Sequence, residues 1–227
     1  MQFRLSLHEV ISKSTQALRA LNFPPGLDIE NGKNIGWLES RGLPGLQILF
    51  EEIKTPSHTP GHNPIKINTM ENIVQFSGRN QSAFYLAQSA VDFAENGKSV
   101  SVKNCRFPLL IFAEMARRTH LPIGFQIKWM EEDKINNGFS ISGNSEIEIN
   151  SKTGMTAYDL NITSHKNIII KNPQKMLYRK KTSIVSGISF HPYQWEAVCA
   201  AAKKVLVPDS DQSHSSPGPE VDEDSSD

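Results

Sequence analysis

Arginine and asparagine side chains beside predicted element ends are the groups in this sequence best suited to binding an anion. Asn104 and Arg106 lie between a strand expected at residues 99–103 and a helix expected to begin at Pro108. Open α/β sheets bind ligands at the carboxyl ends of their strands, and a helix start favours anions because its first backbone N–H groups are unpaired. We therefore expect Arg106 and Asn104 to bind a small carboxylate or another anion. The alternative is that Arg106 is a surface arginine paired with a carboxylate.

The charge distribution adds Arg41 and Arg79 as candidates for binding the same anion. Seven of the 24 Asp and Glu residues follow Pro208, whereas none of the 24 Lys and Arg residues does, so residues 1–208 carry a net charge of +7. A basic body attracts anionic ligands. The basic segment 166–181 contains one aromatic residue, so we interpret it as a strand edge protected by lysines and do not expect nucleic acid as a partner.

A metal site is not expected. His58 and His62 belong to the string His-Thr-Pro-Gly-His, which also occurs in metallo-β-lactamase-like hydrolases, but the His-x-His-x-Asp-His cluster of those enzymes is missing from the sequence. Two histidines on a proline-rich loop without a nearby Cys or carboxylate form a poor ligand set. Walker, dinucleotide-binding, nucleophile-elbow and Cys-x-x-Cys motifs are also missing, so the sequence leaves any cofactor unknown.

Three helices are expected in residues 1–54. Ser6 and Glu9 have the spacing of a capping box, and the first helix should extend to about Leu21. The second helix should end at Gly42, which suits a left-handed backbone, and a third should follow. Gly32 and Gly36 each cost about 1 kcal/mol against alanine inside a helix. Such glycines indicate the close approach of another helix or of a ligand, and we favour a helix.

The order of the later elements predicts the class α+β, with a mixed body at residues 65–207. A helix at 82–94, a strand at 99–103, a helix at 109–118 and a strand at 121–130 suit a βαβ-like crossover with parallel strands. Short strands then follow, as in an antiparallel meander, and a helix that begins at His191 closes it. The expected strands of this meander cover residues 146–150, 156–163, 167–171 and 183–190.

Composition points to a soluble, cytoplasmic protein with a disordered end. The chain has 227 residues, two widely separated cysteines, no apolar stretch of about 20 residues and no signal-peptide pattern at its start. Residues 208–227 form an acidic tail with a single large apolar residue, Val221. Such a tail cannot bury enough surface to offset its loss of backbone entropy, so we expect it to be disordered.

Two resemblances add to this interpretation. The segments LSLHEV, GLDIENGKNIGWLESRGLPGLQIL and VPDS resemble a bacterial family of about 220 residues known as a domain of unknown function, most specifically at WLESRGLPGL. The Arg41-Gly42 turn and the segment SAFYLAQSAVDFAENGKSVSVKNCRFP are similar, more remotely, to the malate/L-lactate dehydrogenase superfamily, which includes sulfolactate and ureidoglycolate dehydrogenases.

This second resemblance implies an oxidoreductase ancestry without the usual acid–base group. The superfamily has Ser-His-Gly where this chain has Leu43-Pro44-Gly45, and a catalytic histidine where it has residues 79–82, Arg-Asn-Gln-Ser. We therefore hypothesise a small-carboxylate-binding enzyme or a degenerate oxidoreductase relative. The alternative is a non-catalytic accessory subunit of an enzyme or a homodimerising module, in which Trp37, Trp129 or Trp195 would anchor the interface.

Overall fold

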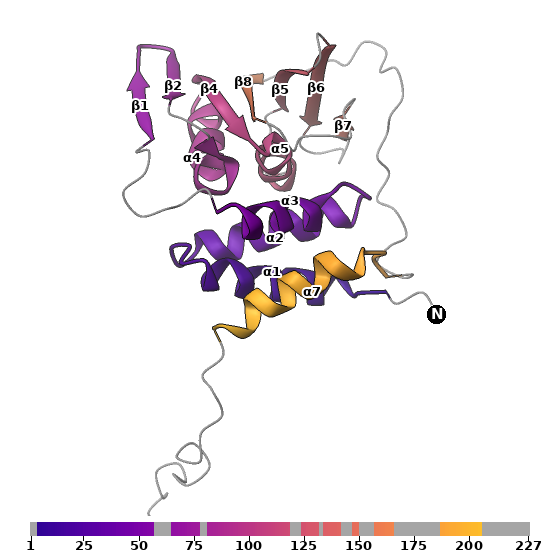
Figure 1. Cartoon of the computed structure of the whole chain (residues 1–227). Coiled ribbons are helices and arrows are strands. Elements are labelled where there is room, and N and C mark those ends of the chain that lie inside the picture. Colours follow the sequence, from indigo (N-terminus) through magenta and orange to yellow (C-terminus); the bar gives the residue numbers. More distant parts are fainter. Residues whose placement is uncertain are drawn as a thin grey trace, which may run out of the picture.

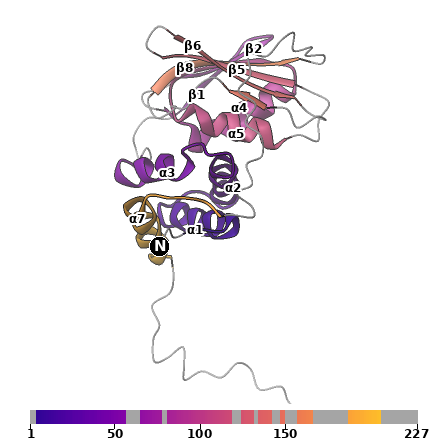
Figure 2. The same ribbon diagram turned by 90° about the vertical axis from the view of Figure 1, so that its right-hand side faces the viewer.

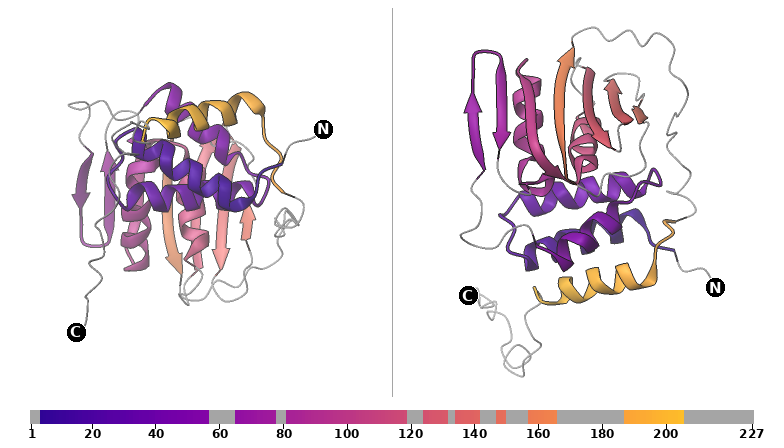
Figure 3. Two further views of the ribbon diagram at one scale, coloured as in Figure 1. Left: turned by 90° about the horizontal axis from the view of Figure 1, so that it is seen from below. Right: turned by 45° about the horizontal axis from the view of Figure 1, so that its top comes forward.

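The protein consists of a mixed sheet, two helices on one face of it, and a separate layer of helices below them (Figures 1 and 2). Seen from below, the helices of this layer run across the direction of the strands (Figure 3). The predicted class α+β is confirmed. None of the described helices has the length and apolar content needed to cross a membrane. The computed structural model describes residues 4–56, 65–77, 81–118, 124–131, 134–141, 147–149, 157–165 and 187–205.

The helical layer contains the three predicted N-terminal helices and the last helix of the chain. Its members are α1 (Leu7–Ala20), α2 (Leu27–Glu39), α3 (Gly45–Lys54) and α7 (Pro192–Lys203). The capping box at α1 is confirmed, because the Glu9 N–H donates to Ser6 Oγ at 3.1 Å and the Ser6 N–H donates to Glu9 Oε2 at 2.8 Å. The left-handed turn after α2 is also confirmed, since Gly42 has φ of +70°. Helix α7 packs against α1 and α3, so the two ends of the described chain meet in this layer.

Gly32 and Gly36 lie where α2 packs against α1. A Cβ added to Gly32 would be 2.2 Å from Thr15 Oγ1 and 3.1 Å from the Ile11 carbonyl oxygen. A Cβ added to Gly36 would be 2.4 Å from Ile11 Cγ1. The prediction that another helix approaches these glycines closely is therefore confirmed.

The sheet combines parallel and antiparallel pairs in the order β1-β2-β4-β8-β5-β6-β7, with the short β3 beside β4. Strands β2 and β4 are parallel and are joined through α4 (Ala83–Glu95), and α5 (Pro108–Arg117) follows β4. The strands are β1 (Lys66–Thr69), β2 (Ile73–Ser77), β3 (Gln81–Ser82), β4 (Ser99–Arg106), β5 (Gly124–Glu131), β6 (Lys134–Ile141), β7 (Ile147–Ile149) and β8 (Ala157–His165).

Strand β8 occupies a central position that the predicted meander did not give it. Strands β5, β6 and β7 form consecutive antiparallel pairs, which were not predicted, because no strand was expected at 134–141 and 121–130 was assigned only to the crossover. Strand β8 pairs with β4 and β5 instead of β7. Strands β4 and β5 are consequently parallel, as the crossover predicted, with β8 between them. The reason is burial: Ile162 of β8 is fully buried opposite Val100 and Ile127, and a long strand with such a residue suits the middle of a sheet.

Helices α4 and α5 cover one face of the sheet and connect it to the helical layer. The rings of Phe76 (β2) and Phe93 (α4) lie 6.0 Å apart, so α4 covers the face of β2 from which the Phe76 side chain projects. On the other side, Asn31 of α2 donates from Nδ2 to the Phe84 carbonyl of α4 at 2.7 Å. Asn34 donates to Glu114 of α5 at 3.0 Å. Buried polar contacts of this kind hold the layers in register.

Candidate functional site

The carboxyl end of β4 meets the N-terminus of α4 and the C-terminus of α3, and we call this place the α4 corner. It is defined by Glu52, Gln81, Ser82, Tyr85 and Arg106. Strand β3 pairs in parallel with the end of β4, so that Gln81 lies opposite Cys105 and Ser82 opposite Arg106. Ser82 is the N-cap of α4, where its Oγ accepts from the Phe84 N–H at 3.4 Å.

Asn104 and Arg106 lie at the end of a strand and before a helix, as predicted. The backbone here is unusual, because Asn104 has φ of +56° and Phe107 has φ of +63°, both in the left-handed region that non-glycine residues seldom adopt. A register shift between Val102 and Cys105 accompanies the first of these. Strained conformations in one short segment are typical of functional sites and of bulges that redirect a side chain.

The Arg106 side chain lies across the end of α3. Its Nη1 donates to the Thr55 carbonyl at 3.3 Å, and its guanidinium carbon is 4.6 Å from the centre of the Phe107 ring. The side chain is half-buried. A guanidinium carries five donors in a plane, and a pair of them can bind a carboxylate in a forked geometry.

The α4 corner also contains buried polar side chains. Glu52 is fully buried, and its Oε2 accepts from Ser82 Oγ at 3.5 Å. Burial, and secondarily the nearby Glu52 carboxylate, raise the pKa of the Tyr85 phenol well above its usual value. Gln81 is 4% exposed, and within the described residues neither its side-chain oxygen nor its nitrogen has a hydrogen-bond partner. An unsatisfied buried group of this kind costs about 1–3 kcal/mol, so the amide is a site for a polar ligand or a water.

Apart from Arg106, the residues of the α4 corner were not predicted as site residues from the sequence. Glu52 had a usable signal, because it follows Ile48 by four residues and Leu49 by three, on the apolar face of α3. A carboxylate on the buried face of a helix needs a specific partner. For Gln81 the signal was the dehydrogenase resemblance, which places residues 79–82 where the superfamily has its catalytic histidine, whereas the burial of Gln81 depends on the pairing of β3 with β4.

Arg41 lies at the other end of α3 and forms a separate candidate. Its guanidinium carbon is 3.9 Å from the centre of the Trp37 ring, and Nη1 donates to Ser40 Oγ at 2.9 Å. Burial lowers the pKa of Arg41 to about 10, and its Nε has no hydrogen-bond partner among the residues described. A ten-residue helix is about 15 Å long, so Arg41 and Arg106 do not share one site. Arg79 lies outside the described residues.

Glu39 closes the N-terminus of α3 beside Arg41. Its Oε1 accepts from the Leu46 N–H at 2.7 Å. Burial raises the pKa of this carboxyl to about 7, although the hydrogen bonds from Leu46 and Gly45 act in the opposite direction. The backbone donors at this helix start are thus already occupied by a side chain.

Several other predicted features are placed by the structure or lie outside it. Trp37 packs edge-on against Phe112 at 5.8 Å, and Trp195 lies 6.0 Å from Phe190, so both rings contact the core instead of standing exposed. The backbone of Trp129 belongs to β5, and its role as an interface anchor stays a prediction. His58, His62, the basic segment 166–181 and the tail 208–227 lie outside the described residues.

Comparison with known proteins confirms both resemblances. Residues 5–83 match a family described as "Protein of unknown function (DUF3726)". None of the curated proteins matches the chain. Among solved structures, malate dehydrogenase from Pyrococcus horikoshii OT3 gives a TM-score of 0.63 at 8% identity, covering 91% of this chain and 96% of that chain.

Two further structures agree with the first. A dehydrogenase from Sinorhizobium meliloti gives a TM-score of 0.61 at 11% identity, covering 89% of this chain and 100% of that chain. Sulfolactate dehydrogenase from Methanocaldococcus jannaschii gives 0.60 at 10% identity, covering 89% of this chain and 97% of that chain. At these identities the likeness shows the fold, which this chain shares with these dehydrogenases.

Proposed function

We propose that this chain binds a small carboxylate, such as a 2-oxo or 2-hydroxy acid, at the α4 corner. The observation that carries the proposal is the buried Gln81 amide, whose oxygen and nitrogen lack partners among the described residues, one strand away from Arg106. The fold is that of enzymes named for malate and sulfolactate, which are both hydroxy acids. That likeness supports the ligand class and leaves the reaction open.

Each group of the corner has a role in this proposal. The Arg106 guanidinium binds the carboxylate, because its planar donors match the two carboxylate oxygens. The Gln81 amide, which can donate and accept, binds the neighbouring oxo or hydroxy oxygen. Ser82 and Tyr85 carry exchangeable protons beside the Glu52 carboxylate, since Ser82 donates to Glu52 and burial, together with the Glu52 charge, raises the pKa of Tyr85. These three groups take the place of the missing histidine if the protein is a catalyst.

A thermal-shift screen of the full chain tests the proposal. Malate, lactate, oxaloacetate and pyruvate are added at millimolar concentration, each with and without NADH or NADPH. A ligand at ten times its Kd raises the free energy of unfolding by about 1.4 kcal/mol. This increase raises Tm by roughly 3–5 °C for a domain of this size. Arg106→Met should abolish the shift, whereas Lys54→Met, which removes an exposed cation from α3, should keep it.

A second pair of variants tests the role of the Gln81 amide separately from that of Arg106. Gln81→Met removes an unsatisfied amide at nearly constant volume, so it should raise the Tm of the ligand-free protein and reduce the shift caused by the acid. Gln194→Met is the matched control, since the Gln194 amide is buried but donates to Tyr193 Oη at 3.3 Å, and its loss should lower Tm. A shift that survives Arg106→Met and Gln81→Met but is lost in Arg41→Met would move the site to the other end of α3. The absence of any shift would contradict the proposal.

A further inference from the structure

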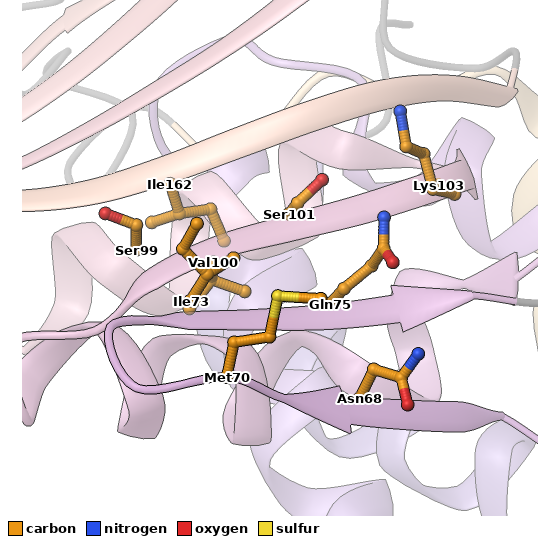
Figure 4. Close-up of a pocket in the computed structure, with 9 residues that line it drawn as sticks. All are labelled: Asn68, Met70, Ile73, Gln75, Ser99, Val100, Ser101, Lys103 and Ile162. Carbon is orange, nitrogen blue, oxygen red and sulfur yellow. The ribbon is translucent and has the colours of Figure 1, made fainter.

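The sheet has a second face that none of the described helices covers (Figure 2). Side chains alternate along a strand, so the residues that follow and precede Phe76 in β2 point away from α4. A groove of about 480 Å³ lies on this uncovered face. It is lined by Asn68, Met70, Ile73, Gln75, Ser99, Val100, Ser101, Lys103 and Ile162 (Figure 4).

One end of the groove is apolar. Met70 and Ile73 form it, and the Met70 side chain extends over the strand toward Gln75 (Figure 4). Val100 and Ile162 border the groove but are buried, because their register with Val74 puts their side chains on the face that α4 covers. Met70 is 62% exposed and Ile73 is 47% exposed, two of the five large apolar side chains that stand exposed in the described part of the chain. Exposed apolar surface with a polar rim marks a binding site more often than it marks an ordinary surface.

The other end of the groove is polar and carries a single kind of charge. Asn68 and Gln75 are cross-strand partners, and Ser101 and Lys103 lie on the same face of β4, whereas Ser99 pairs with Ile73 at the apolar end (Figure 4). Lys103 is the one charged residue of the lining, and it stands at the end opposite Ile73 and Ile162 (Figure 4). Ser99, which pairs with Ile73, and Lys103 are four residues apart, which is about 13 Å along a strand.

We propose that this groove binds an amphipathic anion, with an apolar body on Met70 and Ile73 and an anionic head beside Lys103. Gln75 and Asn68 supply hydrogen bonds along the body. The site does not depend on the carboxylate site, because it is on the uncovered face of β4 whereas the α4 corner is at the end of that strand. The left-handed residue Asn104 separates the two.

Fluorescence titration with 8-anilinonaphthalene-1-sulfonate, which has an apolar body and one negative charge, measures this binding directly. Octanoate should displace the probe, whereas octanol at the same concentration should displace it poorly. Lys103→Gln should weaken binding by roughly three- to fivefold, the value of one exposed charge contact. Ser101→Trp should abolish binding because the indole fills the groove. Met70→Asp, at an exposed turn position, should repel the probe even where the tryptophan variant folds poorly.

Two matched variants should bind as the unaltered chain does. Ile67→Ser removes an equally exposed apolar side chain of β1, 50% exposed, from the opposite face of the strand. Lys203→Gln removes a cation from α7, outside the groove. Equal binding in Met70→Asp and the unaltered chain would overturn the proposal, as would equal displacement by octanol and octanoate. A dimer by light scattering that Met70→Asp converts to monomer would also overturn it, since a second copy would then cover this face.

Discussion

Glu39 is a titrating group at the start of α3, and its environment gives a pH-dependent contribution to stability. Its pKa is about 7 in the folded chain against 4.5 ordinarily, because of burial. Between these two values the folded state holds a proton that the unfolded state has released. The free energy of unfolding should therefore fall as pH rises from about 4.5 to 7, by at most about 3 kcal/mol.

The variant Glu39→Gln tests this, because it keeps an acceptor for the Leu46 N–H and removes the titration. As pH rises from 5 to 7.5, the Tm of the unaltered chain should fall relative to the Tm of the variant. Glu51→Gln, at an exposed position of α3, serves as control and should leave the pH profile unchanged. Parallel profiles for the Glu39 variant and the unaltered chain would show that the carboxyl is ionised throughout.

Single residues differ in how far the sequence alone determines their environment. Ser6, Glu9 and Gly42 act through neighbours within four residues, so a local pattern was sufficient to predict them. Arg106 was placed correctly at a strand end, whereas its ligand role remains a proposal. Gln81 and Glu52 could not be assigned to one site, because the strand pair and the helix that bring them together are set by tertiary packing.

At the scale of elements, the contact between α1 and α2 depends on glycine. Gly32→Ala gains about 1 kcal/mol of helix propensity, but its Cβ would meet Thr15 Oγ1 and the Ile11 carbonyl at distances that require the backbone to move. We expect a net loss of roughly 1–2 kcal/mol, which lowers Tm by about 3–6 °C. Gly36→Ala should cost less, because its nearest atoms belong to the side chains of Ile11 and Leu7 and none to the backbone of α1.

Ile29→Ala is the control for this helix. Ile29 is 40% exposed on α2, so its replacement should change the free energy of unfolding by no more than about 0.5 kcal/mol. Urea unfolding followed by circular dichroism measures all three variants. A Gly32→Ala variant as stable as the Ile29 variant would mean that α1 can withdraw from α2 without loss.

The sheet shows why strand order was harder to predict than strand existence. The crossover from β4 through α5 to β5 follows from local order and was predicted, but a crossover permits a third strand between its two parallel members. Strand β8 takes that place because Ile162 finds Val100 and Ile127 on its two sides. Such pairings join residues more than 30 positions apart, and no local pattern specifies which neighbour a buried strand will choose.

At the scale of the molecule, charged side chains join the helical layer to the sheet. Arg117 of α5 donates from Nη2 to Glu30 Oε2 of α2 at 2.7 Å and from Nη1 to Asn34 Oδ1 at 2.6 Å. Glu114, 4% exposed, accepts from Asn34 Nδ2 at 3.0 Å and from Arg118 Nε at 2.9 Å. These contacts, together with α7 on α1, favour a single cooperative unit, in which the predicted division near residue 54 would not be a folding boundary.

Glu114→Gln tests whether the two layers unfold together. The variant keeps one acceptor but loses the charge that faces Arg117 and Arg118, and hydrogen bonds to charged groups contribute about 1.5–3 kcal/mol. Tm should fall by about 5–10 °C, while near-ultraviolet and far-ultraviolet circular dichroism still change together. Asp92→Asn removes a carboxylate that also contacts Arg118 but is 53% exposed, so it should cost under about 1 kcal/mol. Two separate transitions in the far-ultraviolet signal of Glu114→Gln would show that the layers are separate folding units joined at this contact.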